Sequence, residues 1–551
     1  MSIRYTPRWP LLLALILGVT AVIGLTYATT NKAGDARPSQ GGRYVEGVAG
    51  AVSQVNPLLT MSDAEDDVAK LVFAGLVRLG PKGNVQPDLA EDLPSIGPDG
   101  KTYTFKLRRG LRWQDGVRLT ASDVIFTVNT IKDPAFAGDP RLADVFADVE
   151  VNAPDDQTVV MTLPGPFAPF LAFATVGILP QHRLSGLNAE QLVASPFFEQ
   201  PVGSGPYRLR ELTTSAANLT SYADYHLGPP LVDTIELRFY RDDSLLFKAL
   251  QNTEIDGAFF HTSLPPESIT TIDQNAQWVR RSLHGTTYSL IYLNPELPAF
   301  QDENVRHALQ HAIDENAVIN DALSGQGLPI DSPIAADLWA YVSFPDSYTF
   351  DRNRADSLME DAGWTRGANG WTNDGELLGF TLATIDDPVQ RRIADSVAGQ
   401  WRAFGLQVEV QAIGASQFRD EVLQQHQFEA VLSTIRPSGP DPDPYAFWHS
   451  TQALGGGLNL SGFSNIIVDQ LLESARQTPS SAQRAEDYRV FQDVFSHALP
   501  ALLLNTPTYQ YVVASDLQGL APGLLFSPSS RFFDVHRWFL ETASPSDGDN
   551  G

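Results

Sequence analysis

Cysteine is missing from this sequence of 551 residues. A chain without cysteine has no disulfide framework, no thiolate metal site and no cysteine nucleophile, and it offers no thiol for a lipid anchor. Histidine is scarce as well, with ten residues, so the chain has few imidazole ligands for a borderline metal such as nickel. His307 and His311 have the i, i+4 spacing of a zinc site, but no third ligand is evident and a solvated helix face is favoured. We therefore expect no bound metal and no cofactor.

Basic residues are outnumbered by acidic ones, 38 against 65, and the formal net charge is −27. Binding to nucleic acid or to an anionic membrane surface requires basic patches, so this balance argues against both. The sequence also has no Walker A motif, no H-E-x-x-H motif and no G-x-S-x-G elbow, and no pair of carboxylates stands out. We expect neither catalytic residues nor enzymatic activity.

The N-terminus has the pattern of an exported protein. Residues 1–8 form a basic segment on the cytoplasmic side, and residues 9–28 follow as an apolar run. The run has about the 20 residues that span a bilayer, so it is either an uncleaved signal anchor or a signal peptide cleaved near Ala28. We favour the anchor, because no cysteine is present to retain the chain through a lipid. Residues 29–42 then form a polar tether and residues 544–551 a disordered tail, and the part between them lies outside the cytoplasm.

Strand and helix signatures alternate along the folded part, which indicates an α/β protein. Residues 102–107 alternate apolar and polar side chains and predict a strand. Thr120 with Asp123, and Ser62 with Glu65, have the spacing of capping boxes and predict the starts of two helices.

Four separate blocks of the sequence match one set of motifs. They are YTFKLRRGLRWQDGVRLTASDVIFT at 103–127, PVGSGPYRL at 201–209, VRHALQHAIDENAVI at 305–319 and GAVSQVNPL at 50–58. With shorter matches between them, they extend in order over about residues 43–540. On these motifs the chain resembles the family 5 extracellular solute-binding proteins, which are the dipeptide-, oligopeptide- and nickel-binding subunits of ABC importers.

The resemblance implies an α/β, periplasmic-binding-protein-like fold, with two lobes, a hinge and a smaller third domain inserted in the first lobe. The first lobe is then formed by residues 43–80, 201–286 and 506–543, the inserted domain by 81–200, and the second lobe by 287–505. Apolar periodicity predicts one long helix over residues 302–323 at the start of the second lobe. A strand over 502–513 is expected to return the chain to the first lobe.

The implied function is capture of a peptide, or of a similar small polar solute, outside the cytoplasmic membrane. The lobes are expected to close around the ligand and to deliver it to the permease and ATPase subunits of an ABC importer. We expect a monomer that is held at the membrane by its N-terminal helix and does not bind nucleic acid. A membrane-anchored ligand sensor and a binding protein for sugars or nickel remain alternatives, and a secreted hydrolase is the least favoured.

The loop at residues 436–448 is the expected centre of ligand contact. In peptide-binding members of the family, an aspartate just ahead of an Asp-Pro segment pairs with the α-ammonium group of the peptide. Here Ser438 occupies that position, and a serine hydroxyl does not provide the same charge-assisted bond, so Asp441 substitutes only if the loop is shifted. The predicted ligand contacts are Val52, Ser53, Trp339, Arg436, Ser438, Asp441, Tyr445 and Trp448.

Overall fold

The structure is a computed structural model that describes residues 40–344, 348–437, 439, 441–454 and 456–541. The predicted basic segment, the apolar run, all but the end of the tether and the tail lie outside these residues, as does Ser438. Within the described part, no helix is long and apolar enough to cross a membrane.

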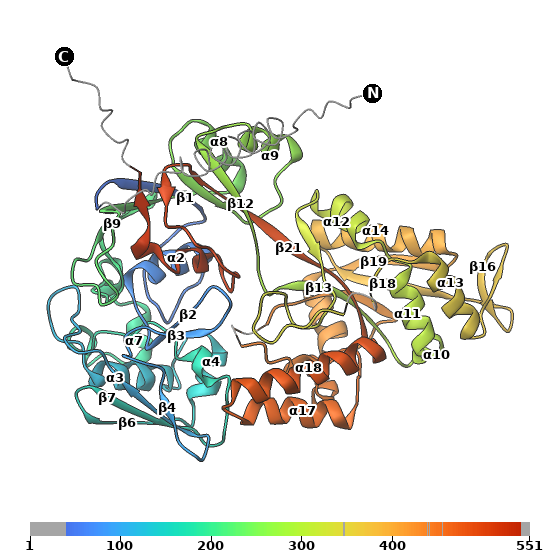
Figure 1. The fold of residues 1–551 in the computed structure, drawn as a ribbon, viewed down its shortest axis with the longest axis horizontal. Helices are drawn as coiled ribbons and strands as arrows, with labels where there is room; N and C mark the ends of the chain where they lie inside the picture. The colour runs from blue at the N-terminus through green and yellow to red at the C-terminus, as the bar shows by residue number, and fades with distance from the viewer. Residues whose placement is uncertain (1–39, 345–347, 438, 440, 455, 542–551) are drawn as a thin grey trace, which may run out of the picture.

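A mixed sheet of twelve strands extends through most of the molecule (Figure 1). Its main path is β19-β18-β20-β13-β21-β11-β1-β10-β9-β8, and β12 and β14 pair with β21 beside that path. In chain order the strands are β1 (Arg43–Ala49), β8 (Tyr207–Leu212), β9 (Ala216–Ser221), β10 (Thr234–Tyr240), β11 (Gly257–Phe260), β12 (Trp278–His284), β13 (Tyr288–Leu293), β14 (Gly327–Pro329), β18 (Gly379–Ile385), β19 (Gln407–Ile413), β20 (Ala430–Ile435) and β21 (Ala501–Ala514).

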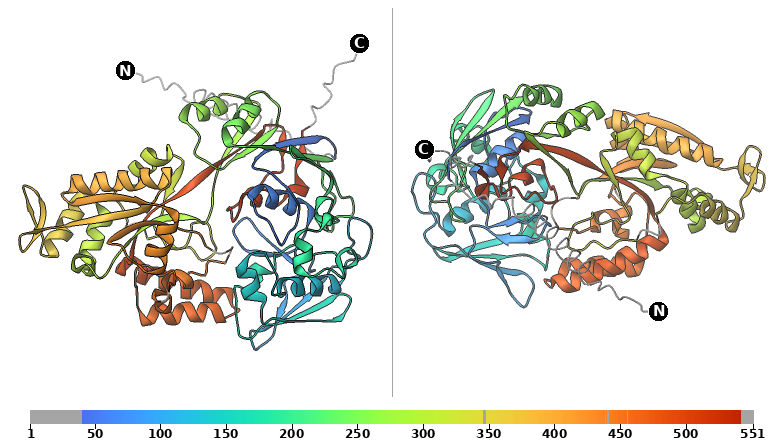
Figure 2. Two further views of the ribbon diagram at one scale, coloured as in Figure 1. Left: turned by 180° about the vertical axis from the view of Figure 1, so that it is seen from behind. Right: turned by 45° about the horizontal axis from the view of Figure 1, so that its top comes forward.

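The long strand β21 joins the two halves of this sheet, as three views of the ribbon show (Figures 1 and 2). Its first residues pair with β13, where Tyr292 lies opposite Ala501, and its last residues pair with β11, where Gly257 lies opposite Val513. The chain crosses between the halves a second time at residues 285–287, between β12 and β13. The predicted strand over 502–513 is therefore confirmed. Two extended crossings have the geometry of a hinge.

Buried hydrophobic residues form four clusters that define three bodies. Two of the clusters form the N-terminal body, around Tyr44 and Leu246. One forms the inserted body, around Phe105, and the largest forms the C-terminal body, around Leu502. We use these names for residues 43–73 with 207–284 and 508–540, for residues 74–202, and for residues 287–505, respectively.

The inserted body contains a separate antiparallel sheet in the order β4-β5-β7-β6. Strand β5 (Thr102–Lys106) buries Tyr103 and Phe105, as its alternating pattern predicts. Thr120 and Asp123 form the predicted capping box at the start of α3 (Ala121–Ile131). The other elements are β2 (Val77–Leu79), β3 (Val85–Pro87), β4 (Ser95–Ile96), α4 (Pro140–Phe146), β6 (Glu150–Asp155), β7 (Thr158–Thr162), α5 (Phe170–Phe173), α6 (Gln181–Leu184) and α7 (Ala189–Val193).

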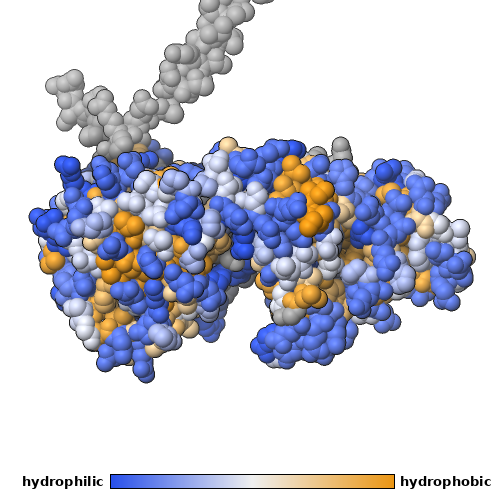
Figure 3. All heavy atoms as spheres, turned by 90° about the horizontal axis from the view of Figure 1, so that it is seen from below, coloured by the Kyte–Doolittle hydropathy of each residue, from blue (hydrophilic) through white to orange (hydrophobic). Residues whose placement is uncertain are grey.

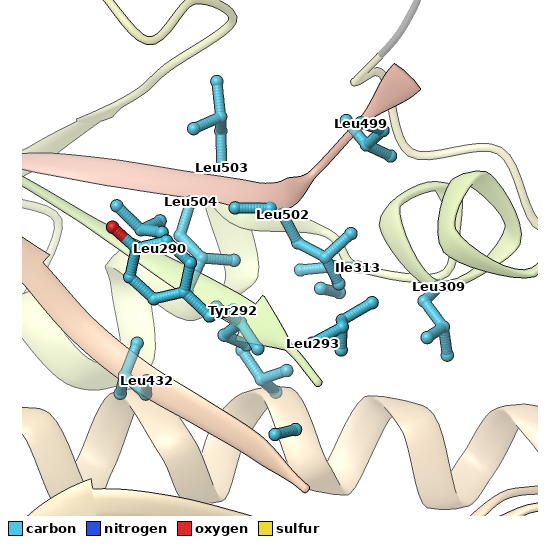
Figure 4. Packing of buried hydrophobic residues seen from close by; sticks show 14 of the residues in the cluster. Leu290, Tyr292, Leu293, Leu309, Ile313, Leu432, Leu499, Leu502, Leu503 and Leu504 are labelled. Atoms are coloured by element: carbon cyan, nitrogen blue, oxygen red, sulfur yellow. The ribbon is translucent and has the colours of Figure 1, made fainter. Parts of the chain in front are cut away.

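The C-terminal body surrounds β13 and the first half of β21 with helices. Figure 4 shows part of this core, where leucines and a tyrosine of the two strands lie near Leu309 and Ile313. Its helices are α10 (Pro298–Gln301), α11 (Glu303–His311), α12 (Glu315–Leu323), α13 (Arg352–Asp361), α14 (Pro388–Phe404), α15 (Ala415–Gln417), α16 (Tyr445–Trp448), α17 (Ile466–Gln477) and α18 (Ser481–Ala498), and a small sheet is formed by β15 (Thr365–Gly367), β16 (Gly370–Asn373) and β17 (Glu376–Leu377). In the N-terminal body the helices are α2 (Asp63–Val72), α8 (Asp243–Gln251) and α9 (Pro266–Asp273), and β22 (Leu517–Gln518) pairs with β23 (Phe539–Leu540).

The prediction of one helix over residues 302–323 is wrong, because two helices, α11 and α12, fill this stretch. The chain leaves the helical path after His311, and the Asp314 carboxylate accepts a hydrogen bond from the backbone N–H of Ala317 as the N-cap of α12. Buried Ala312 and Ile313 continue the apolar pattern through the break, so periodicity alone does not reveal it.

The two histidines of α11 both contact backbone carbonyls. His307 Nε2 lies 2.8 Å from the carbonyl oxygen of His497, and His311 Nδ1 lies 2.7 Å from that of Thr349. Among the described residues, no group of His, Cys, Asp and Glu is arranged to hold a metal ion. The predicted solvated helix face is therefore wrong for His311, which is buried, and both rings help to fix α11 to its neighbours.

The second predicted capping box forms only in part. The Ser62 hydroxyl accepts a hydrogen bond from the Glu65 backbone N–H and caps α2 as expected. The Glu65 carboxylate, however, accepts hydrogen bonds from the Ser53 hydroxyl at 2.9 Å and from the Met61 backbone N–H at 2.8 Å. Glu65 therefore fixes the loop that precedes the helix instead of completing the capping box.

Candidate functional site

A cavity of about 300 Å³ lies where the three bodies meet. The N-terminal body contributes Lys70 of α2, Phe73 directly after that helix and the segment 523–533, and the inserted body contributes Leu142 of α4 and residues in the range 172–177. Gly439, in the predicted ligand loop, lines it from the C-terminal body. Seen from below, the molecular surface is mainly hydrophilic with scattered apolar patches, and it is hollowed between the two halves (Figure 3).

A buried ionic cluster fixes the wall of this cavity. Arg531 donates hydrogen bonds to both carboxylate oxygens of Asp67, at 2.7 and 2.6 Å, and its Nε donates to Glu46 at 2.6 Å. Burial alone lowers the pKa of Arg531, but the Asp67 and Glu46 carboxylates outweigh it and raise that pKa well above the usual value. Because Asp67 lies on α2 and Arg531 lies within the cavity segment 523–533, the cluster holds two cavity walls together.

The predicted ligand loop is held by two ion pairs with helices of the C-terminal body. Asp441 accepts a hydrogen bond from Arg484 at 2.5 Å, and Asp443 accepts one from Arg476 at 2.8 Å. The Asp441–Arg484 pair is largely buried, with side-chain exposures of 14% and 8%. In this structure the Asp441 carboxylate, a ligand contact predicted from the sequence, is therefore engaged by Arg484.

The aromatic residues predicted as ligand contacts pack against protein groups. Trp448 is fully buried, with its ring 4.7 Å from Phe495. Trp339 is half-buried and lies 6.0 Å from Tyr488. The Tyr445 ring stacks on His449 at 4.1 Å. Of these three, Trp448 has no exposed surface to offer a ligand in this structure.

Of the remaining predicted contacts, Val52 and Ser53 belong to the N-terminal body and Arg436 belongs to the C-terminal body. Val52 is buried in the N-terminal body. Ser53 is exposed, and its hydroxyl donates a hydrogen bond to the Glu65 carboxylate. Burial raises the pKa of Tyr509 on β21, and the nearby charge of Arg436, which is exposed, opposes part of that rise. The loop around Arg436 thus faces the strand that connects the two halves.

A second contact links the inserted body to the C-terminal body away from β21. The backbone N–H of Ala168 donates to the carbonyl of Arg476 at 2.7 Å, and the Arg476 guanidinium lies 5.4 Å from the Phe167 ring and 4.1 Å from the Tyr445 ring. Tyr103 also lies near this contact: burial raises its pKa to about 12, with opposing effects of Arg484 and Asp441. The predicted ligand loop is therefore connected, through Arg476, to the inserted body.

None of the residues that line the cavity is among those predicted from the sequence. They come from segments far apart in the chain, and no spacing motif marks them, although Pro57 lies in the matched block at 50–58 and Gly439 lies in the predicted loop at 436–448. Only the fold brings them together.

A cavity between bodies that are joined by two extended crossings is the architecture of a protein that holds a solute between hinged lobes. The comparison with known families agrees: residues 84–455 match the model for bacterial extracellular solute-binding proteins, family 5 Middle. The chain belongs to this family of solute-binding proteins.

Several characterised proteins are similar over almost the whole chain. Protein XP55 of Streptomyces lividans is 30% identical over 95% of both chains, and the oligopeptide-binding protein AppA of Bacillus subtilis is 26% identical over 92% of both. The solved structure of AppA with a nonapeptide has a TM-score of 0.65 at 25% identity, covering 92% of this chain and 100% of that one. The open, unliganded form of the murein tripeptide-binding protein MppA shares the fold, with a TM-score of 0.78 at 18% identity over 91% and 97% of the two chains.

Proposed function

We propose that this protein is the substrate-binding component of an ABC import system that captures peptides outside the cytoplasmic membrane. In this proposal it delivers them to a permease that is driven by ATPase subunits. Similarity to an oligopeptide-binding protein over 92% of the chain supports peptides over sugars or nickel as the ligand class. Membership of a family of solute-binding proteins supports transport over catalysis.

The observation that carries the proposal is the cavity lined by all three bodies, with Gly439 of the ligand loop on one side and α2 on the other. A ligand in this cavity contacts the N-terminal and inserted bodies and, at Gly439, the C-terminal body. Rotation about β21 and residues 285–287 then closes the halves on the ligand, and the ligand stabilises the closed form by the contacts it makes only there. Such a change gives a permease a distinct surface to recognise.

We also propose the division into a discontinuous first lobe (43–80, 201–286 and 506–543), an inserted domain (81–200) and a second lobe (287–505). The separate apolar clusters support this division, because each cluster draws most of its residues from one of these parts.

The N-terminal run at 9–28 is proposed to anchor the protein, as a monomer, to the outer face of the cytoplasmic membrane. Its length and the basic residues before it support the anchor. Cell fractionation tests this: the full chain is expected in the membrane fraction with its run intact by mass spectrometry, and a chain that begins near Gly42 in the soluble fraction. Cleavage near Ala28 contradicts the anchor and leaves export unaffected.

Uptake of a labelled oligopeptide by cells that make the protein tests the transport function. Deletion of the gene is expected to abolish uptake, and the full-length gene is expected to restore it. Unchanged uptake, together with loss of a peptide-induced transcriptional response, favours the alternative of a membrane-anchored sensor.

A further inference from the structure

The cavity at the meeting point of the three bodies has a lining whose chemistry specifies more than a general peptide site. Its walls are mainly apolar side chains, namely Phe73, Leu142, Phe173, Val176, Leu524 and Phe526. Its volume of about 300 Å³ lies at the lower end of the range for small-molecule pockets, about 300 to 1,000 Å³. A space of this size accepts one end of an oligopeptide but not the whole chain.

Three charged residues line the cavity, and two of them already have partners. The Asp66 carboxylate accepts hydrogen bonds from the hydroxyls of Ser529 at 2.6 Å and Ser527 at 3.0 Å. The Asp139 carboxylate caps α4 through the backbone N–H of Arg141 at 2.9 Å and pairs with the guanidinium of the same residue at 2.7 Å. Both carboxylates therefore have hydrogen-bond donors within the protein, and Asp139 also has a cationic partner.

Lys70 is the third charged residue and the only cation among the described residues of the lining. Within the part of the chain that the structure describes, its ammonium group has neither a hydrogen bond nor an ion pair. Burial raises the pKa of Asp88, but its hydrogen bond with His226 at 2.6 Å and, to a smaller extent, the charge of Lys70 lower that pKa overall. The direct partner of Asp88 is therefore His226 and not Lys70. Lys70 is half-buried as a residue, and an ammonium group beside apolar walls favours a carboxylate partner.

Resting on the proposed function, we propose that this cavity binds the carboxyl-terminal residue of the peptide, with an apolar side chain against the aromatic wall and the α-carboxylate at Lys70. The peptide then extends from the cavity past Gly439 towards the ligand loop. Apolar residues are preferred at the last position, and a basic residue is disfavoured there because its side chain would lie in an apolar cavity next to Lys70. A free carboxylic acid with an apolar chain has the same chemistry, and the experiment separates the two sources.

Isothermal titration of the full-length protein with matched peptides tests the proposal without any mutation. The peptide Ala-Ala-Ala-Leu with a free carboxylate is expected to bind at least tenfold more tightly than its C-terminal amide, and more tightly than Ala-Ala-Ala-Lys. Lys70→Met keeps the length of the side chain, and it is expected to reduce the affinity for the free acid about tenfold and to leave the amide unchanged. Lys248→Met, at an exposed position of α8 outside the cavity lining, is the matched control and is expected to change neither affinity. Val176→Trp fills the cavity and is expected to remove the preference for leucine over alanine at the last position.

Equal affinity of the free acid and the amide for the wild-type protein overturns the contact with Lys70 while the proposed peptide function stands. Failure of every peptide to bind contradicts the proposed function and this inference together. Binding of decanoate with no binding of peptides identifies a free apolar acid as the occupant and overturns the assignment to a peptide terminus.

Discussion

The backbone N–H of Ala168 in the inserted body donates a hydrogen bond of 2.7 Å to the carbonyl of Arg476 at the end of α17. The Arg476 side chain lies between the Phe167 and Tyr445 rings, with its guanidinium carbon 5.4 and 4.1 Å from their centroids. It also donates to Asp443 of the ligand loop. One arginine therefore connects the inserted body, the ligand loop and α17 at a point far from β21.

Arg476→Ala is expected to loosen the inserted body from the C-terminal body, because it removes two ring contacts of about 0.5 to 2 kcal/mol each. It also leaves the Asp443 carboxylate, whose pKa burial already raises, without its cationic partner. Arg476→Lys retains a charge for Asp443 but loses the planar stacking, so an intermediate effect is expected.

The distance between the inserted and C-terminal bodies can be measured with spin labels. The chain has no cysteine of its own, so two introduced cysteines are the only sites for the labels. Spin labels at Glu150→Cys and Ala482→Cys, both exposed, report the distance between the two bodies. A broader distance distribution in Arg476→Ala than in the parent is expected. Identical distributions would show that Arg476 does not hold the bodies together.

The Asp441–Arg484 pair is expected to be structural. Asp441→Asn leaves a buried guanidinium without its anion, so the free energy of unfolding is expected to fall by about 3 kcal/mol. Adding Arg484→Met to that variant removes the uncompensated charge and is expected to recover part of the loss. Denaturant unfolding measures both, with Asp395→Asn at an exposed position of α14 as the control.

A different outcome would assign Asp441 to the ligand. If Asp441→Asn keeps the stability of the parent and loses affinity only for peptides with a free amino terminus, the Asp441 carboxylate binds the peptide ammonium group. In the complex, that ammonium group then replaces Arg484 as the partner of the carboxylate.

Glu315 is expected to make stability depend on pH. It is only 7% exposed, and burial raises its pKa from the usual 4.5 to about 8. Between about pH 4.5 and 8, Glu315 therefore keeps its proton in the folded protein and releases it in the unfolded chain. The contribution of Glu315 to stability is complete below pH 4.5 and is lost as the pH rises towards 8, by up to about 5 kcal/mol.

Thermal unfolding between pH 5 and 9 compares the parent with Glu315→Gln, which resembles the protonated acid. The variant is expected to lose less stability as the pH rises, whereas Glu360→Gln, at an exposed position of α13, is expected to follow the parent. Parallel curves for all three proteins would place the titration elsewhere.

Local elements with strong end signals were predictable from the sequence. The start of α3 at Thr120 and Asp123 is one case, and the end of α14 is another, where Gly405 adopts a φ of +106° that favours glycine. The break between α11 and α12 was missed because Ala312 and Ile313 continue the apolar pattern, although Asp314 has the character of an N-cap.

The candidate site was less predictable than the fold. The loop at 436–448 does reach the cavity, but through Gly439, while Asp441 and Trp448 are engaged within the C-terminal body. Lys70 lies on the α2 helix, whose start at Ser62 was predicted, and nothing in its local sequence separates it from any solvated lysine. Its position beside Phe173 and Phe526 arises only when three distant segments meet.

The central claim is that this protein binds peptides, and the most direct measurement is ligand binding by the full-length protein. Native mass spectrometry identifies any ligand that co-purifies, and thermal unfolding with added peptides, sugars or nickel follows. A ligand at 100 times its Kd adds about 2.7 kcal/mol of stability, which a melting curve resolves. We expect peptides to co-purify and to raise the melting temperature. A rise with sugars or nickel and none with peptides of any length would contradict the claim.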